Sequence, residues 1–255
     1  MTMNISWSSF WYSFKKYSEF NRKEINAIIL SAAIIGFIIA FRGTVDQPDR
    51  TLFDFGFALR NLIDSILIVS LAIIVKQICQ RAAAVHSGFK AVYRIWWYGL
   101  GLGIILGFAT MGRFWFLAPG GIMVYHLAGH RLGSFRYGLN YWPLGIIGLV
   151  GPVSLILLAI FFKIMMNVFP ANALIAKAFV FNLVFAGFSA LPIPPLDGSH
   201  MFFASRMFYI FALGTIIGLC VALYFMSIGW ALLIGLLIGV LVWQIYLWTF
   251  ETPGK

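Results

Sequence analysis

Hydrophobic residues in this chain gather into long apolar stretches that are separated by short polar segments. About 20 consecutive apolar residues form a helix that crosses a hydrocarbon core of about 30 Å, and most of the stretches are close to that length. The pattern therefore predicts an all-α polytopic membrane protein. Its apolar segments run at about 25–41, 61–80, 96–118, 144–169, 173–191, 208–227 and 229–249.

Composition supports this prediction. Of the 255 residues, 62% are hydrophobic and only 10% are charged, and the mean hydropathy is +0.93. These values leave no room for a sizeable soluble domain. The formal net charge of +10 is better explained by membrane topology than by nucleic acid, because cytoplasmic loops of membrane proteins are rich in Lys and Arg. We therefore expect no nucleic-acid partner.

The segment at 96–118 differs from the others because glycine crowds its first half. Gly99, Gly103 and Gly107 form a four-residue repeat, which suits close helix packing. The alternative is that the segment enters the membrane and returns on the same side. If it does not cross, 13 of the 18 Lys and Arg residues fall on one side of the membrane. That bias favours about six transmembrane helices plus one re-entrant or extra helix, with both termini cytoplasmic.

The chain is expected to contain three parts. Residues 1–24 carry aromatic residues at helical spacing among basic ones, a pattern typical of an amphipathic helix in the membrane interface. Residues 25–205 form the membrane core, and 206–255 form a C-terminal transmembrane hairpin around a tight turn at 227–229. Between 119 and 143, residues 120–125 and 134–138 have β-like composition and predict a small β-hairpin at the membrane surface.

The candidate site is an acidic residue in an apolar setting. Asp197 follows a long apolar segment, and Pro192, Pro194 and Pro195 precede it. A carboxylate inside a membrane costs about 2.5–3.5 kcal/mol on insertion scales, so it marks a candidate functional site. The prolines force an extended, non-helical backbone. A rigid kink that presents a carboxylate to the protein interior is an arrangement suited to a metal ligand.

The run from Leu191 to Gly198 resembles the second motif of the site-2 protease family of intramembrane zinc metalloproteases. In that family the Asp of this motif is the third zinc ligand, which corresponds to Asp197. The pair Gly151-Pro152 resembles the start of the preceding core helix of the family. The resemblance extends over roughly residues 60–205, and within this range the chain looks like archaeal members of the family. It implies a substrate or partner groove at Ser189, Pro192, Pro194 and Pro195.

The family's first motif, His-Glu-x-x-His, supplies two zinc ligands and a general base, and the chain has no such run. One candidate replacement is His126 with His130, which have the i, i+4 spacing of two ligands on one helical face. In that register Leu127 stands in place of the Glu and cannot accept a proton. Together with Asp197, these histidines would form a zinc site.

The second candidate lies at the end of the second apolar segment, about 75 residues before Gly151-Pro152. In this register Lys76 and Gln80 replace the two histidines and Gln77 replaces the general base. A protonated Lys has no lone pair for zinc. It would pair with Asp197 and supply the positive charge of the missing metal. The alternative is that Lys76 and Arg81 only anchor the helix end at the interface.

Three functions remain open at this stage. The favoured one is a pseudoprotease of an archaeal plasma membrane, without catalysis and without a cofactor, that binds transmembrane segments or serves as a subunit of a membrane complex. The alternative is an intramembrane zinc metalloprotease that uses His126, His130 and Asp197, although loss of a general base costs about 10² to 10⁴ in rate. A transporter or channel is the third, because Asp197 lies beside a proline-broken helix.

Overall fold

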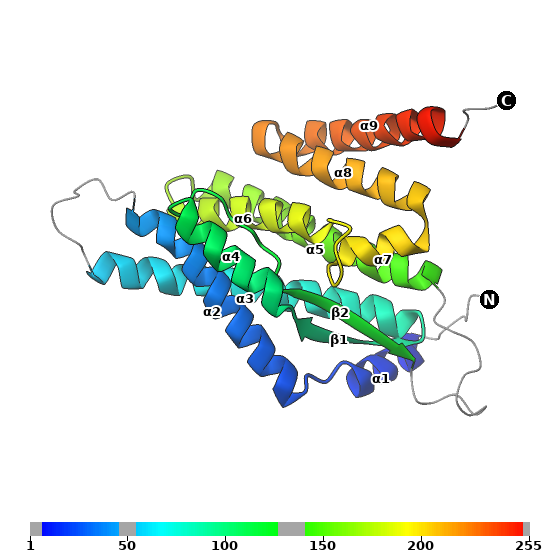
Figure 1. Cartoon of the computed structure of the whole chain (residues 1–255), viewed down its shortest axis with the longest axis horizontal. Coiled ribbons are helices and arrows are strands. Elements are labelled where there is room, and N and C mark those ends of the chain that lie inside the picture. The colour runs from blue at the N-terminus through cyan, green and yellow to red at the C-terminus, as the bar shows by residue number, and fades with distance from the viewer. Residues whose placement is uncertain (1–6, 46–54, 127–140, 252–255) are drawn as a thin grey trace.

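The computed structural model describes residues 7–45, 55–126 and 141–251, and the described part is mostly helical (Figure 1). The helices follow the predicted apolar segments closely, because in lipid each segment has to satisfy its backbone hydrogen bonds internally. They are α1 (Trp7–Tyr17), α2 (Arg22–Val45), α3 (Phe55–His86), α4 (Trp97–Ala109), α5 (Tyr141–Val168), α6 (Ala173–Ser189), α7 (Asp197–Ala204), α8 (Arg206–Phe225) and α9 (Ile228–Tyr246), which continues into a π-helical turn at Leu247–Glu251.

Five of the described helices are long and apolar enough to cross a membrane: α2, α3, α5, α8 and α9 with its π-helical end. The predicted count of about six included α6, which has 17 residues. At 1.5 Å per residue it is about 26 Å long, slightly shorter than a hydrocarbon core of about 30 Å. The described residues therefore contain five candidate membrane spans, and a sixth span remains a prediction.

Helix α4 belongs to a segment that returns to its starting point. The backbone N–H of Trp96, just before α4, donates to the carbonyl oxygen of Pro119 at 2.9 Å. The 13 residues of the helix extend only about 20 Å. The chain then comes back in extended form, and Gly103 packs against the carbonyl oxygen of Phe116. Because its two ends are hydrogen-bonded neighbours, the segment 96–119 does not connect opposite faces of the molecule.

A two-stranded antiparallel sheet joins the two sides of this returning segment. Strand β1 (Phe89–Ile95) pairs with β2 (Gly120–His126), with Ile95 opposite Gly120 and Phe89 opposite His126. The prediction of a strand at 120–125 was therefore right, and within the described residues this strand pairs with one that precedes α4. The predicted return strand at 134–138 lies outside the described residues. The long-range pairing follows from the return of α4, which a local hairpin pattern does not reveal.

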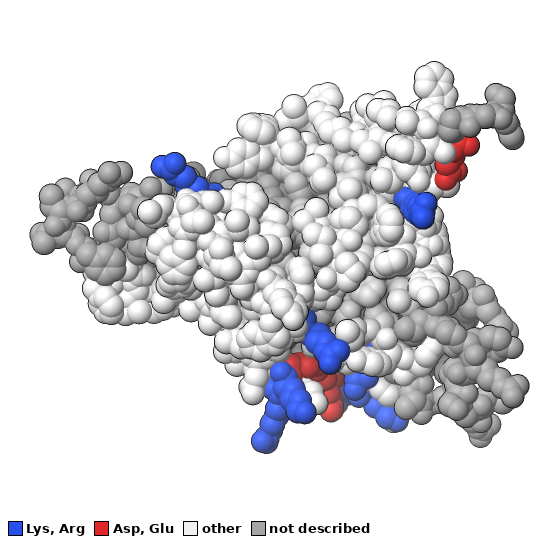
Figure 2. All heavy atoms as spheres, viewed as in Figure 1, with Lys and Arg blue, Asp and Glu red and all other residues white. Residues whose placement is uncertain are grey.

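The last two spanning helices form an antiparallel pair at one edge of the molecule (Figure 1). A side-chain carbon on Gly235 or Gly239 would collide with Leu219 or Thr215, respectively. These glycines let the backbones of α8 and α9 approach closely. Figure 2 shows that the visible face of the helices is almost free of charge, and that Lys and Arg gather mainly at the edge that carries α1 and the start of α2.

Short helix α7 is held between α5, α6 and β2 at points where a side chain would not fit. A Cβ on Gly148 of α5 would lie 2.8 Å from the carbonyl oxygen of Asp197, and one on Gly198 would lie 2.1 Å from that of Ala190. A Cβ on Gly121 of β2 would lie 1.7 Å from the carbonyl oxygen of Pro195. Distances below about 3 Å exclude a side chain, so these glycines fix the position of the segment that carries Asp197.

We predict that Gly121→Ala destabilises the protein by about 1–3 kcal/mol, because the added methyl group overpacks the contact between β2 and Pro195. The free energy of unfolding in detergent, measured by SDS titration with circular dichroism, checks this. Gly101→Ala is the matched control, since nothing lies within 4 Å of a Cβ there. A loss in Gly101→Ala equal to that in Gly121→Ala would contradict the proposed contact.

Candidate functional site

Asp197 is the first residue of α7, and its side chain is completely buried. The residues before it cannot continue helix α6, because the sequence Pro192-Ile193-Pro194-Pro195 removes backbone donors and keeps the chain out of the helical region. Helix α6 accordingly ends at Ser189, and Leu196 has the extended backbone of a helix N-cap. The proline run thereby brings the carboxylate of Asp197 back against the end of α6.

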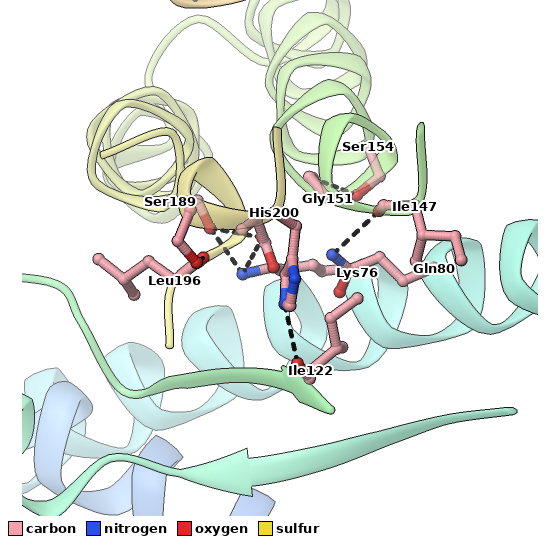
Figure 3. A network of polar contacts seen from close by, with 11 residues as sticks. Lys76, Gln80, Ile122, Ile147, Gly151, Ser154, Ser189, Leu196 and His200 are labelled. Carbon is pink, nitrogen blue, oxygen red and sulfur yellow. Dashed lines mark hydrogen bonds and ion pairs between the residues drawn. The ribbon is translucent and has the colours of Figure 1, made fainter. Parts of the chain in front are cut away.

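The carboxylate forms an ion pair with Lys76 of α3. The Nζ atom of Lys76 lies 2.7 Å from Oδ2 of Asp197, and the exposed fractions of the two side chains are 3% and 0%. Ser189 completes a triangle: Lys76 Nζ donates to Ser189 Oγ at 2.6 Å, and Ser189 Oγ donates to Asp197 Oδ2 at 3.0 Å. Figure 3 shows Lys76 reaching from α3 toward the ends of α6 and α7.

Gln80 reaches the same place from one turn further along α3. A Cβ on Gly151 would lie 2.4 Å from Asp197 Oδ2 and 2.5 Å from Gln80 Nε2. Asp197 Oδ2 and Gln80 Nε2 are therefore within about 5 Å of each other, and both lie against the backbone of α5 at Gly151. Gln80 Nε2 donates a long hydrogen bond, 3.5 Å, to the carbonyl oxygen of Ile147. Position 151 therefore has to be glycine, because a side chain there would collide with both Asp197 and Gln80, which approach from different helices.

Among the described residues, two buried oxygen atoms at this centre have no hydrogen-bond partner: Oδ1 of Asp197 and Oε1 of Gln80. Oε1 of Gln77, the neighbour of Lys76 on α3, is unpaired in the same way. A buried acceptor without a partner costs about 1–3 kcal/mol. The ring of Phe185 also contributes, because its centroid lies 5.0 Å from Lys76 Nζ and its face attracts a cation. The centre is therefore rich in acceptors and has one ammonium group to satisfy them.

Arg81 is buried in a polar cluster, so the alternative that it only anchors the end of its helix at the interface does not hold. Its side chain is 2% exposed, and its Nη2 lies 2.6 Å from Oε1 of Glu24 in α2. Arg81 Nη1 donates to the carbonyl oxygens of Ser18 and Glu19, and the guanidinium stacks 3.9 Å above the ring of Phe20. This cluster ties the end of α3 to the link between α1 and α2.

The same glutamate also fixes the sheet. Glu24 Oε1 accepts a hydrogen bond from the backbone N–H of Tyr93 at 2.9 Å, on the edge of β1 that faces away from β2. The hydroxyl of Tyr93 lies 2.9 Å from Ser31 Oγ. Burial raises the pKa of this phenol, while the hydrogen bond with Ser31 acts to lower it. The signal in the sequence was a single Glu in the first turn of α2, which gave no indication of its distant partners.

The histidines of the first candidate register do not form a helical ligand pair in the described structure. His126 is the last residue of strand β2, with its ring 5.3 Å from that of Phe89, and His130 lies outside the described residues. Along a strand that rises about 3.4 Å per residue, His126 is about 17 Å beyond Gly121, the residue that contacts Pro195. A different histidine, His200 of α7, reaches β2, with Nε2 3.1 Å from the carbonyl oxygen of Ile122.

The side chains around Asp197 do not fit a zinc ion. Zinc in proteins is held by thiolate, imidazole and carboxylate groups. Here the groups nearest the carboxylate are the ammonium of Lys76, the hydroxyl of Ser189 and the amide of Gln80. Within the described ranges there is no group of three His, Cys, Asp or Glu side chains placed to bind a metal ion. The ammonium already donates to the oxygen that would face a metal.

The fold and this centre define a polytopic membrane protein whose helices meet at a buried Lys–Asp pair. A protein of Methanocaldococcus jannaschii named "Putative zinc metalloprotease MJ0611" is 30% identical to this chain over 186 residues, which cover 71% of this chain and 84% of the relative. No family model matches the chain, and no solved structure matches it significantly. The chain belongs to the same metalloprotease-like family as this archaeal protein.

We predict that Lys76→Met lowers the free energy of unfolding by about 3–5 kcal/mol, because it leaves the carboxylate of Asp197 buried without its cation. The double variant Lys76→Met/Asp197→Asn removes both charges with little change in volume, so it should recover most of that loss. SDS titration of all variants in detergent measures the coupling between the two sites. Additive losses in the double variant would contradict an ion pair between these residues.

Proposed function

We propose that this chain is a degenerate, non-catalytic member of the site-2 protease family, a pseudoprotease that binds transmembrane segments of other membrane proteins. The main support is the ion pair between Lys76 and Asp197. It lies where the family resemblance expects an imidazole and a carboxylate to share a metal. The ammonium supplies a fixed positive charge at that position, and a charge of this kind holds the helices together without activating water.

The replacement at position 77 supports the same conclusion. The family's first motif has a general-base Glu between its histidines, and this chain has Gln77 there. An amide does not take a proton from water at ordinary pH. Loss of a general base alone costs about 10² to 10⁴ in rate. A protease that lacks this base and two imidazoles has lost its chemistry, while the packing that surrounds its centre remains.

The partner-binding region is proposed to be the proline run between α6 and α7. Pro192, Ile193 and Pro194 are exposed while Ser189 and Asp197 are buried. The run lies against the start of β2 through Pro195 and Gly121. The run forms a turn in which the Leu196 N–H donates to the carbonyl oxygen of Ile193 at 2.7 Å, and this turn holds the exposed side chains of the run in a fixed arrangement. We place the chain in the plasma membrane of an archaeal cell, with both termini in the cytoplasm.

We predict that the purified wild-type protein carries almost no zinc, and that Lys76→His/Gln77→Glu/Gln80→His carries about one zinc per chain, because two imidazoles then join Asp197 as ligands. Elemental analysis after dialysis measures the metal. Adding Asp197→Asn to the triple variant should abolish the gain. About one zinc per wild-type chain, or wild-type cleavage of a reconstituted transmembrane substrate that Asp197→Ala abolishes, would show that the protein is a metalloprotease.

A photocrosslinking amino acid in place of Ile193 tests partner binding. We expect it to capture transmembrane segments of other membrane proteins in the native membrane, since Ile193 is 38% exposed within the proline run. Leu233 of α9, which is 58% exposed, is the control position for a side chain that faces lipid. Mass spectrometry of the crosslinked products identifies the partner. Equal products from both positions would rule out the proline run as a specific binding region.

A further inference from the structure

A groove between α6 and α8 lies apart from the buried ion pair. Its walls are α6 from Val180 to Gly187 and α8 from Ile217 to Phe225, and its volume is about 360 Å³. The lining residues are apolar except for the thiol of Cys220 and the phenol of Tyr224. Cys220 Sγ donates to the carbonyl oxygen of Leu183 at 3.3 Å, so the thiol is already paired within the protein. The groove therefore selects an apolar occupant.

The length of the groove is close to that of a lipid hydrocarbon chain in one leaflet. From Val180 to Gly187 the wall extends about 10 Å, at 1.5 Å per residue. That is most of one leaflet, which is half of a hydrocarbon core of about 30 Å. The bare backbone of Gly187, with nothing within 4 Å of a Cβ, leaves its inner end open.

One end of the groove carries a positive charge. Lys163 of α5 donates hydrogen bonds from Nζ to the carbonyl oxygens of Leu223 and Met226, the residues that flank Tyr224 and Phe225. Its Nζ also lies 5.6 Å from the ring centroid of Phe179, next to Val180. An ammonium has three donors, and these two carbonyls account for two of them. The cation thus lies at the end of the groove lined by Val180, Tyr224 and Phe225.

We propose that this groove binds an anionic membrane lipid, with one hydrocarbon chain between α6 and α8 and the headgroup phosphate at Lys163. The positive charge at one end of the groove binds the headgroup of the lipid, and the apolar walls accommodate its hydrocarbon chain. The lipid fills the space between α6 and the α8–α9 pair. This inference does not depend on the proposed pseudoprotease function.

Native mass spectrometry of the full chain in detergent tests the site, with dioleoyl phosphatidylglycerol and dioleoyl phosphatidylcholine as probes of identical chains. We expect the wild type to bind the anionic lipid about tenfold more tightly, the typical effect of one hydrogen bond to a charged group. Lys163→Gln should remove this preference and Lys163→Arg should keep it. Equal binding of both lipids by the wild type would overturn the proposal.

A second variant tests the apolar half without touching the charge. Gly187→Leu fills the groove with a side chain that meets no neighbour, so it should weaken binding of both lipids while the protein stays folded. Gly101→Leu, at a helical glycine of α4 whose Cβ also meets no neighbour, is the matched control and should bind as the wild type does. Unchanged lipid binding in Gly187→Leu would refute the assignment. A protein helix that is crosslinked in the groove in place of the lipid would refute it as well.

Discussion

The structure depends on neutralising one carboxylate in an apolar interior. Asp197 is fully buried, and an isolated charge in such a place is strongly unfavourable. Lys76 and Ser189 compensate for it from two different helices. A buried ion pair of this kind adds little net stability compared with well-packed apolar side chains. Removal of either partner leaves the other charge buried and unpaired, which destabilises the fold. The two side chains therefore hold α3 and α7 in one relative position.

The glycines explain how the backbone reaches this position. Gly148, Gly151 and Gly198 each lie where a Cβ would come within 3 Å of Asp197 or of the residues just before it. The chain carries no side chain at these points, so helices α5, α6 and α7 converge around a small polar centre. A second ion pair, between Arg81 and Glu24, lies just over one helical turn beyond Lys76 on α3. It fixes the other side of α3 to α2 and to strand β1.

Much of the fold was predictable because the membrane restricts what an apolar segment can be. The segments at 25–41, 61–80, 144–169 and 229–249 correspond to helices α2, α3, α5 and α9 within a few residues at most ends. The pairing of β1 with β2 was not predictable from local patterns, because 24 residues separate the strands and α4 lies between them. The two-residue turn Ser87-Gly88 separates β1 from α3 and marks the start of the strand, but nothing in its seven residues identifies β2 as the partner.

The candidate site was predictable to the extent that its chemistry is visible in single residues. The pairing of Lys76 with Asp197 follows from one requirement, that a buried cation and a buried anion in lipid need each other. No comparable requirement identifies the partners of Glu24, because a Glu in the first turn of a helix is ordinarily explained by the helix dipole. Glu24 instead accepts from Asn21, Arg81 and Tyr93 at once.

The contrast between the two ion pairs bears on how the protein works. The Arg81–Glu24 pair is surrounded by donors and acceptors that match, apart from Nε of Arg81. At the Asp197 centre, two oxygen atoms (Oδ1 of Asp197 and Oε1 of Gln80) have no partner among the described residues. A region whose only role is to hold helices together gains nothing from unmatched acceptors, since each one is costly. Around Asp197 one ammonium, which has three donors, leaves acceptor capacity unfilled, so this centre is less completely satisfied than the Arg81–Glu24 pair. The centre directly follows the exposed proline run in the chain, and the contacts that fix Asp197 against α5 therefore also fix the position of that run.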